Sequence, residues 1–377
     1  MKKKLFLTSI IILVLITFIT IIASMNNFKI EYRPFKNEGF YTEQKDKKEI
    51  IKVTNSDFVK ADFVAPTFVN EDILAFQFDT SEEFKSHIGV IYRKNNNYER
   101  IYTTEKGKII NSLVGSKNKI FWVENDRFFN NDLNWKIKSM NLTTKEISEV
   151  RSGITSDQIL PPVLTIYNNK ITWIEKIIEN NIIYSTAILY NPENGALKEI
   201  FSVELDETTT RDGIFMVIQK PIENGVIIQQ TVFTSDSDEI DKSVELMYYP
   251  YNSTKSTLLK KGEGVIDFTA NENWFVWSEI GKINIKNRKT DKIEYVINGL
   301  DPDLTLDSLF IIGDVLYYRY SMHQIFQVNL KTGDIKEVTP SRLVTSKIFY
   351  SDNYLSFSHI DVKKNNGEVE FTILSID

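Results

Sequence analysis

The sequence predicts an all-β fold built from about seven repeats, each a four-stranded antiparallel sheet. Three observations support this prediction. A pattern of two apolar segments around a short polar turn recurs along the 377-residue chain. Ile, Tyr and Phe, which favour strands, are abundant. After Ala23, no segment shows the long apolar period of 3.6 residues that a helical repeat requires. Together these features favour a seven-bladed β-propeller.

The amino terminus predicts a membrane-directed helix. Lys2, Lys3 and Lys4 precede an apolar run from Leu5 to Ala23, which is long enough to cross a bilayer core of about 30 Å. The lysines are expected to stay in the cytoplasm, which puts the rest of the chain outside. We expect residues 1–25 to form an uncleaved signal-anchor that holds the chain in the membrane through residues 5–23. A cleaved signal peptide, and hence a secreted protein, is the alternative. Residues 26–47 then form a polar linker.

The repeated unit begins with a hairpin whose second strand provides an alignment point. The first residue of that strand recurs about every 47 residues on average, a spacing typical of propeller blades: Ile73, Ile120, Ile171, Val226, Phe275, Val315 and Tyr354. A second hairpin completes the unit, and its clearest examples are residues 139–147, 189–200 and 328–338. Each unit is therefore expected to contain four strands.

The last repeat lacks a fourth strand, and the first strand of the domain is expected to supply it. Residues 48–53 share the pattern Lys-Glu-Ile-x-x-Val with residues 145–150 and 198–203, which are expected fourth strands. Pairing residues 48–53 with the strand around Phe371 would close the ring and cover an open sheet edge. The alternative is a chance match. This arrangement predicts one propeller domain over residues 48–377.

Residues 328–338, Val-Asn-Leu-Lys-Thr-Gly-Asp-Ile-Lys-Glu-Val, resemble the blade hairpins of TolB-type and prolyl-oligopeptidase-type bacterial propellers. The resemblance covers residues 48–377. It implies the architecture and no single function, because proteins of this superfamily have many roles. No WD, kelch, sialidase or quinone-type repeat motif is present, and no fused hydrolase domain is expected after the propeller.

Composition excludes several kinds of chemistry. The chain contains no cysteine, which excludes disulfides, thiolate catalysis and cysteine-ligated metals. The net charge of −6 makes a nucleic-acid partner unexpected. His87, His323 and His359 are expected in solvated loops, so neither a metal site nor a cofactor is predicted.

Candidate site residues come from a polar position near the end of each second strand. Four residues after each alignment point the side chain is polar: Gln77, Glu124, Glu175, Gln230, Glu279, Arg319 and Ser358. These side chains are expected to surround a polar mouth on the face that carries the long loops between second and third strands. Arg127 and Phe128 lie in one of those loops, and loops on a rigid scaffold often bind partners. Solvated strand ends without a function are the alternative.

These patterns favour an extracytoplasmic binding or scaffold module. Its partner would be a protein, a peptide or a cell-envelope glycan, bound through the long-loop face. The alternative is a hydrolase or lyase in which Glu124, Glu175 or Glu279 acts as acid or base, provided that a low-dielectric pocket raises a pKa. A purely structural role is a third hypothesis.

Overall fold

The chain folds into strands wherever its structure is described. The computed structural model describes residues 48–54, 64–80, 84–127, 132–156, 159–206, 212–236, 239–253, 255–299, 301–339, 344–360 and 368–376. No helix in these segments is long and apolar enough to cross a membrane. The expected membrane segment, the linker and Phe128 lie outside the described residues.

Four sheets contain four strands each, and in each the strands follow one another in chain order. The first two sheets contain β2 (Ala65–Val69), β3 (Ile73–Thr80), β4 (Lys85–Tyr92) and β5 (Asn97–Thr103), then β6 (Lys108–Ser116), β7 (Lys119–Asp126), β8 (Asp132–Asn141) and β9 (Ile147–Ser156). The other two contain β18 (Asp267–Ala270), β19 (Trp274–Glu279), β20 (Lys282–Asn287) and β21 (Lys292–Asn298), then β22 (Leu306–Ile312), β23 (Val315–Tyr320), β24 (Gln324–Asn329) and β25 (Ile335–Glu337).

An eight-stranded sheet repeats the same four-strand order twice. It contains β10 (Thr165–Tyr167), β11 (Lys170–Glu179), β12 (Ile182–Asn191), β13 (Ala196–Asp206), β14 (Gly213–Ile222), β15 (Gly225–Asp236), β16 (Glu239–Pro250) and β17 (Thr257–Lys261). Only one residue pair, Leu205 with Gly213, joins β13 to β14. The two halves are therefore best described as separate four-stranded units, which pack against each other through an apolar cluster that includes Ile174 and Met216.

The remaining sheet contains strands from both ends of the described chain. Its strands are β26 (Val344–Thr345), β27 (Phe349–Ser351), β28 (Tyr354–Ile360), β29 (Glu368–Ser375) and β1 (Lys48–Thr54). Strand β1 runs antiparallel to β29 over its whole length and places Ile51 opposite Phe371. Both β26 and β27 pair with β28.

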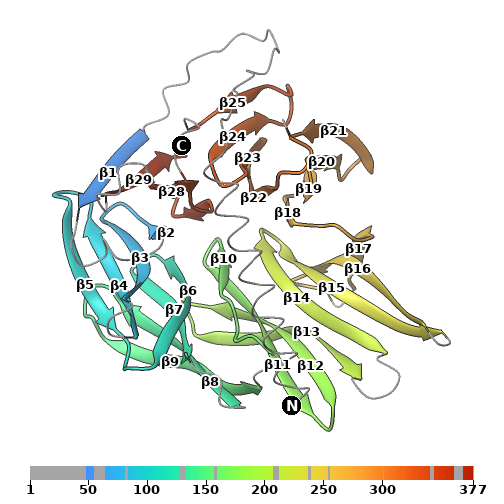
Figure 1. Cartoon of the computed structure of the whole chain (residues 1–377), viewed down its shortest axis with the longest axis horizontal. Coiled ribbons are helices and arrows are strands. Elements are labelled where there is room, and N and C mark those ends of the chain that lie inside the picture. The colour runs from blue at the N-terminus through green and yellow to red at the C-terminus, as the bar shows by residue number, and fades with distance from the viewer. Residues whose placement is uncertain are drawn as a thin grey trace, which may run out of the picture. The chain divides into compact units, whose positions relative to one another are not determined.

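The sheets surround a common centre, with the first strand of each innermost (Figure 1). Strands β2, β6, β10, β14, β18 and β22 contact one another in that order, and β2 also contacts β27 and β28. Apolar side chains fill the space between neighbouring sheets. Trp122 packs between the first sheet and the second, and Trp173 packs between the second sheet and the β10–β13 unit. Both side chains are fully buried. A Cβ atom on Gly115 would lie 2.2 Å from the ring of Phe68, so only glycine permits this approach of β6 to β2.

Two histidines are buried, so the expectation of solvated loop positions is wrong for them. His87 lies within β4, where Thr80 and Thr103 contact its two ring nitrogens at 3.0 and 2.9 Å. His359 lies within β28, where its Nδ1 is 3.1 Å from the hydroxyl oxygen of Thr345. Both lie within strands, close to the loop between the second and third strands of their sheets, and the alternation of side chains along each strand turns them inward.

The burial of His359 predicts a loss of stability in acid. Burial, with a smaller contribution from Lys48, lowers the pKa of His359 to about 4. In the unfolded chain the pKa of His359 is near 6.5, so on acidification the unfolded state binds a proton at a higher pH than the folded state does. The stability that is present above pH 6.5 is therefore lost as the pH falls toward 4. At pH 4.5 this loss should be about 2–3 kcal/mol. In His359→Asn the urea midpoint should fall less between pH 7.5 and pH 4.5 than in the original chain. An equal fall in both proteins would contradict this assignment.

Candidate functional site

The seven polar residues proposed for the mouth occupy equivalent positions in β3, β7, β11, β15, β19, β23 and β28, but most are not solvated. Glu175 and Gln230 lie within β11 and β15 and not at their ends. Relative exposure is 6% for Glu124, 6% for Glu175, 3% for Gln230 and 5% for Arg319. Gln77 and Glu279 are half-buried. Ser358 is fully buried. The expectation of an exposed rim is therefore wrong for five of the seven residues. The cause is that neighbouring strands provide hydrogen-bonding partners that cover them.

Glu124 and Glu175 connect consecutive sheets. Glu124 accepts hydrogen bonds from the hydroxyl of Tyr102 at 2.5 Å and from Nζ of Lys138 at 2.8 Å, and Tyr102 belongs to β5 of the preceding sheet. Glu175 accepts two hydrogen bonds from Arg151 of β9, at 3.0 and 2.9 Å. The indole of Trp173 donates a third at 2.9 Å. Charge-assisted bonds of this kind fix both carboxylates in place.

Glu279 repeats this arrangement with lysines. It accepts hydrogen bonds from the indole of Trp277 at 3.0 Å and lies 3.3 Å from Lys260 and 2.9 Å from Lys282. Desolvation acts to raise the pKa of Glu279, but the three donors outweigh it and hold this pKa below its usual value. A general acid needs a raised pKa, so the contacts of Glu279 do not favour acid catalysis.

Gln77, Gln230 and Arg319 also contact nearby strands. Gln77 donates to the backbone oxygen of Ile110 in the next sheet at 3.2 Å. Gln230 accepts a hydrogen bond from the hydroxyl of Tyr249 at 3.2 Å. Arg319 donates twice to Asp307, at 2.7 and 2.6 Å, and once to the backbone oxygen of Thr345 of β26 at 2.8 Å. The row of polar residues is thus mainly a layer of contacts between strands and sheets.

Arg127 lies beside the row, immediately after β7. It donates to Asp79 of the neighbouring sheet at 2.9 Å, and its guanidinium lies 5.9 Å from the centre of the exposed ring of Phe84. Arg127 therefore contacts an aromatic side chain of the neighbouring sheet, a contact that the sequence did not predict. Phe128, the other residue proposed there, lies outside the described residues.

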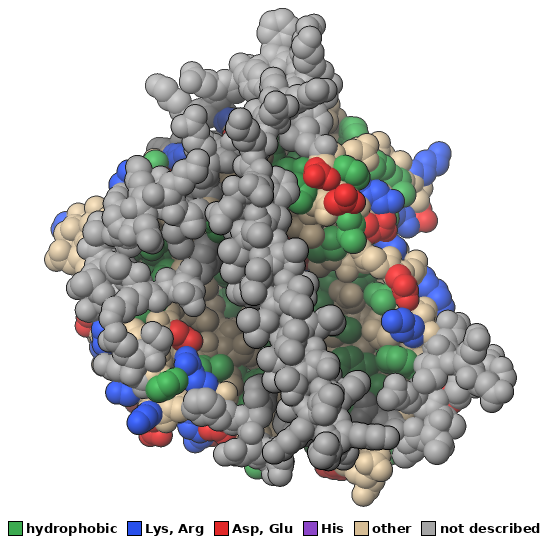
Figure 2. Space-filling model, in the orientation of Figure 1, with side chains coloured by type: hydrophobic (Ala, Val, Ile, Leu, Met, Phe, Trp, Pro, Cys, Tyr) green, Lys and Arg blue, Asp and Glu red, His purple; other side chains and the backbone are tan. Residues whose placement is uncertain are grey.

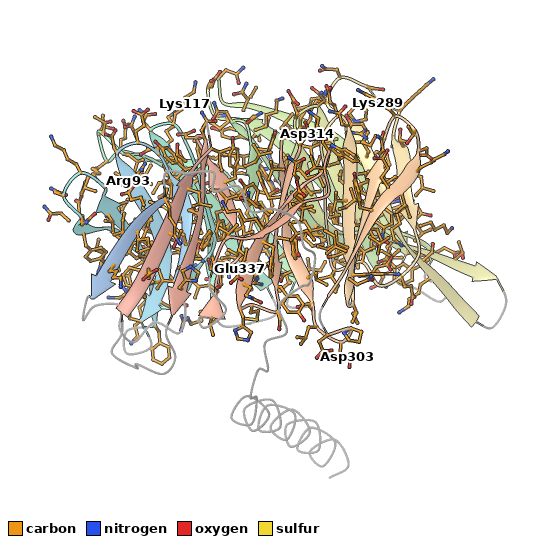
Figure 3. All side chains as sticks on the ribbon, turned by 90° about the horizontal axis from the view of Figure 1, so that it is seen from above. Arg93, Lys117, Lys289, Asp303, Asp314 and Glu337 are labelled. Carbon is orange, nitrogen blue, oxygen red and sulfur yellow. The ribbon has the colours of Figure 1, made fainter. Side chains whose placement is uncertain are left out.

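The loop face is the end of the sheets where second strands end and first strands begin. Exposed apolar side chains gather on it: Phe84, Ile154, Leu160, Val163, Ile177, Ile280 and Met322. Apolar patches lie among charged side chains on this face (Figure 2). The hairpin face is the opposite end, where Arg93, Lys117, Lys289 and Asp314 lie, whereas Asp303 lies at the loop face (Figure 3). Sequence analysis did not single out most of these apolar residues, because the burial of a side chain depends on neighbouring strands and loops.

A cavity of about 390 Å³ opens on the hairpin face. First strands and their turns line it, and the lining residues are Gly115, Ile166, Tyr167, Asn168, Asn169, Tyr350, Ser351, Asp352 and Asn353. Sequence reasoning read the Asn-Asn and Asp-Asn pairs only as turn residues. Within the described segments, no group of three or more His, Asp or Glu side chains could hold a metal ion.

Comparison with known proteins identifies the fold. No protein-family model and no curated protein matches the sequence. Among solved structures, a prolyl endopeptidase is similar over 80% of this chain and 46% of its own, with 10% identity and a TM-score of 0.54. The propeller domain of the Trilobed protease from Pyrococcus furiosus matches over 80% and 92%, with 11% identity and a TM-score of 0.53. An acylaminoacyl peptidase from Pyrococcus horikoshii matches over 80% and 50%, with 11% identity and a TM-score of 0.51.

These similarities define the class of protein as a β-propeller. They confirm the propeller architecture that the resemblance of residues 328–338 implied. The chain spans about half the length of the prolyl endopeptidase and of the acylaminoacyl peptidase. At 10–11% identity the likeness concerns the fold alone.

Proposed function

We propose that the chain is a seven-bladed β-propeller, closed by β1, that binds a protein or peptide partner through its loop face. Counting each half of the eight-stranded sheet as one blade supports seven blades. The pairing of β1 with β29 supports the closure. Contacts of β2 with β27 and β28 support a complete ring, because they join the first blade to the last.

The proposed location is the outer side of a membrane. Its support is the apolar run over residues 5–23 behind Lys2, Lys3 and Lys4, which fits an anchor. Cleavage of this segment would give a secreted form of the same module. In either case residues 26–47 separate the propeller from the membrane-directed segment.

The observation that carries the proposal is that seven of the fifteen exposed large apolar side chains of the described segments lie at the loop face. Ile280 and Met322, both at turns on the loop face, are 63% and 50% exposed. Apart from Val217 and Ile218 on the inner strand β14, the other exposed large apolar side chains of the described segments lie on outer strands: Ile50, Ile147, Leu197, Leu258, Ile293 and Val296. Clusters of exposed apolar residues are typical of partner-binding surfaces, whereas isolated ones are common everywhere. A protein or peptide therefore fits this face better than a glycan does.

Single cysteines test both the face and the location, because the chain has none of its own. Ile280→Cys and Met322→Cys place a thiol on the loop face. Ile293→Cys and Leu258→Cys are matched controls on outer strands, with 52% and 49% exposure. All four variants should react on intact cells with a membrane-impermeant maleimide that carries a photo-crosslinker. After illumination, the two loop-face variants should form an adduct with one partner, and the controls should not.

Two results would contradict the proposal. Labelling only after cell lysis would place the domain on the inner side of the membrane. Equal adduct formation from loop-face and outer-strand positions, or none from the loop face, would exclude this face as the binding surface.

A further inference from the structure

The cavity on the hairpin face has an aromatic wall made by strands far apart in the sequence. Tyr167 lies on β10, Phe310 on β22 and Tyr350 on β27. The ring centres of Phe310 and Tyr350 are 4.9 Å apart, and Tyr167 stacks on Tyr350 at 6.5 Å with an interplanar angle of 29°. Tyr167 and Tyr350 line the cavity, and Phe310 packs against both rings without being a lining residue.

Two hairpin turns supply the polar side of the cavity. Asn168 and Asn169 form the turn after β10, and Asp352 and Asn353 form the turn after β27, all with positive φ. Asn169 accepts a hydrogen bond from Ser116 at 2.7 Å, and Asn353 accepts one from the hydroxyl of Tyr350 at 3.3 Å. These two hydrogen bonds fix the orientation of the side chains of Asn169 and Asn353.

Other polar groups of the cavity are available to a ligand. Within the described part of the chain, the hydroxyl of Tyr167 and the amide of Asn168 have no hydrogen-bond partner. Burial raises the pKa of Tyr167, so its hydroxyl stays protonated and can donate to a ligand. The hydroxyl of Tyr350 already donates to Asn353. Asp352 accepts a hydrogen bond from the backbone of Lys117 and keeps acceptor capacity for further donors.

The charge of the lining limits the class of ligand. The lining contains one carboxylate, Asp352, and no lysine or arginine side chain. This composition disfavours the binding of phosphates and other anions. Its volume is at the lower end of the range for small-molecule sites, about 300–1,000 Å³. A small uncharged ligand with one apolar face and several hydroxyl groups satisfies the aromatic wall and the amide rim together.

We infer that this cavity binds a neutral saccharide of one or two pyranose units, with a sugar face on Tyr167 or Tyr350 and its hydroxyls on Asn168 and Asp352. The site is separate from the proposed partner surface, which lies on the loop face. It would give the propeller a second ligand of different chemistry.

Titration of the purified full-length chain with N,N′-diacetylchitobiose and with cellobiose, followed by NMR, tests the inference. At least one of the two sugars should bind with a Kd on the order of 1 mM, as expected for a ligand of this size. Tyr167→Leu should weaken binding roughly 5–10-fold by removing the stacking surface. Asn168→Gly should weaken it roughly 3–10-fold and leave the melting temperature unchanged, because glycine accepts the positive φ of this turn.

Asn181→Gly is the matched control, since Asn181 also has a positive φ but lies in the β11–β12 turn on the loop face. It should bind sugar like the original chain. If Tyr167→Leu fails to fold, Asn168→Gly still decides the question. The inference is overturned if neither sugar binds at about 20 mM, which is far above the expected Kd, or if Asn168→Gly binds as well as the original chain. Tighter binding of tetramethylammonium than of either sugar would also overturn the inference, because it would show that the rings of Tyr167 and Tyr350 bind a cation.

Discussion

Deletion of residues 26–53 is expected to lower the melting temperature by roughly 10 °C relative to deletion of residues 26–47 alone, and to cause aggregation. The two variants differ only by residues 48–53, nearly all of β1. That strand pairs with β29 at every residue, so its loss exposes a long unpaired edge. It also removes Ile51, which is 1% exposed and packs in one cluster with Phe76 and Phe371.

A side-chain clasp adds to the effect of β1. Arg93, in the turn between β4 and β5, forms an ion pair with Glu49 of β1, and its guanidinium lies 4.4 Å from the ring centre of Tyr354. Arg93 therefore links its own sheet to two strands of the last sheet, β1 and β28. Burial of one Ile side chain contributes about 1.5–3 kcal/mol, and backbone hydrogen bonds add to this. Calorimetry and light scattering of the two deletion variants would measure the difference.

A point variant separates loss of the strand from loss of chain length. Ile51→Asp places a charge against Phe371 and should reproduce much of the destabilisation in the full-length protein. Ile50→Asp is its matched control, because Ile50 is 45% exposed on the other face of β1. Identical melting of the two deletion variants, or of the two point variants, would show that β1 does not close the ring.

Arg319→Met is expected to cost about 3–5 kcal/mol of unfolding free energy, because it removes one member of a buried ion pair and leaves the other behind. The guanidinium is 5% exposed and joins β22 to β26 through Asp307 and the backbone oxygen of Thr345. Its removal leaves a carboxylate and a buried carbonyl without their donor. Urea unfolding at pH 7.5 would measure the loss.

A surface ion pair provides the comparison for Arg319. Lys136 pairs with Glu149 at 2.8 Å, but both side chains are about half-exposed, so Lys136→Met should cost less than about 1 kcal/mol. The double variant Arg319→Met/Asp307→Leu should regain part of the loss, because it leaves no unpaired carboxylate. If Arg319→Met costs as little unfolding free energy as Lys136→Met, Arg319 is solvated, as the sequence first suggested, and is not part of a buried ion pair.

Most strand positions could be predicted from the sequence. Each alignment residue, from Ile73 to Tyr354, lies at the first or second position of its observed strand. These boundaries are predictable because short turns of Asn, Asp and Gly residues are local signals. The likeness of residues 48–53 to other fourth strands also pointed to the strand that pairs with β29.

The surroundings of the polar strand ends were not predictable in the same way. Glu175 lies on a strand by its pattern, but its burial depends on Arg151, which belongs to the preceding sheet. Periodicity along one strand contains no information about which side chain a neighbouring sheet places opposite. The same holds for the cavity, where Tyr167 and Tyr350 meet only because the strands surround a common centre.

The position of β1 has a consequence for the time course of synthesis. Lys48 leaves the ribosome before Glu368, and about 320 residues separate the two strands that must pair. At roughly 5–20 residues per second, β1 waits about a quarter of a minute to a minute for β29 to be made. During this interval Ile51 and the edges of β1 lack the partner strand β29, so β1 can join its sheet only after residues 368–375 have been made.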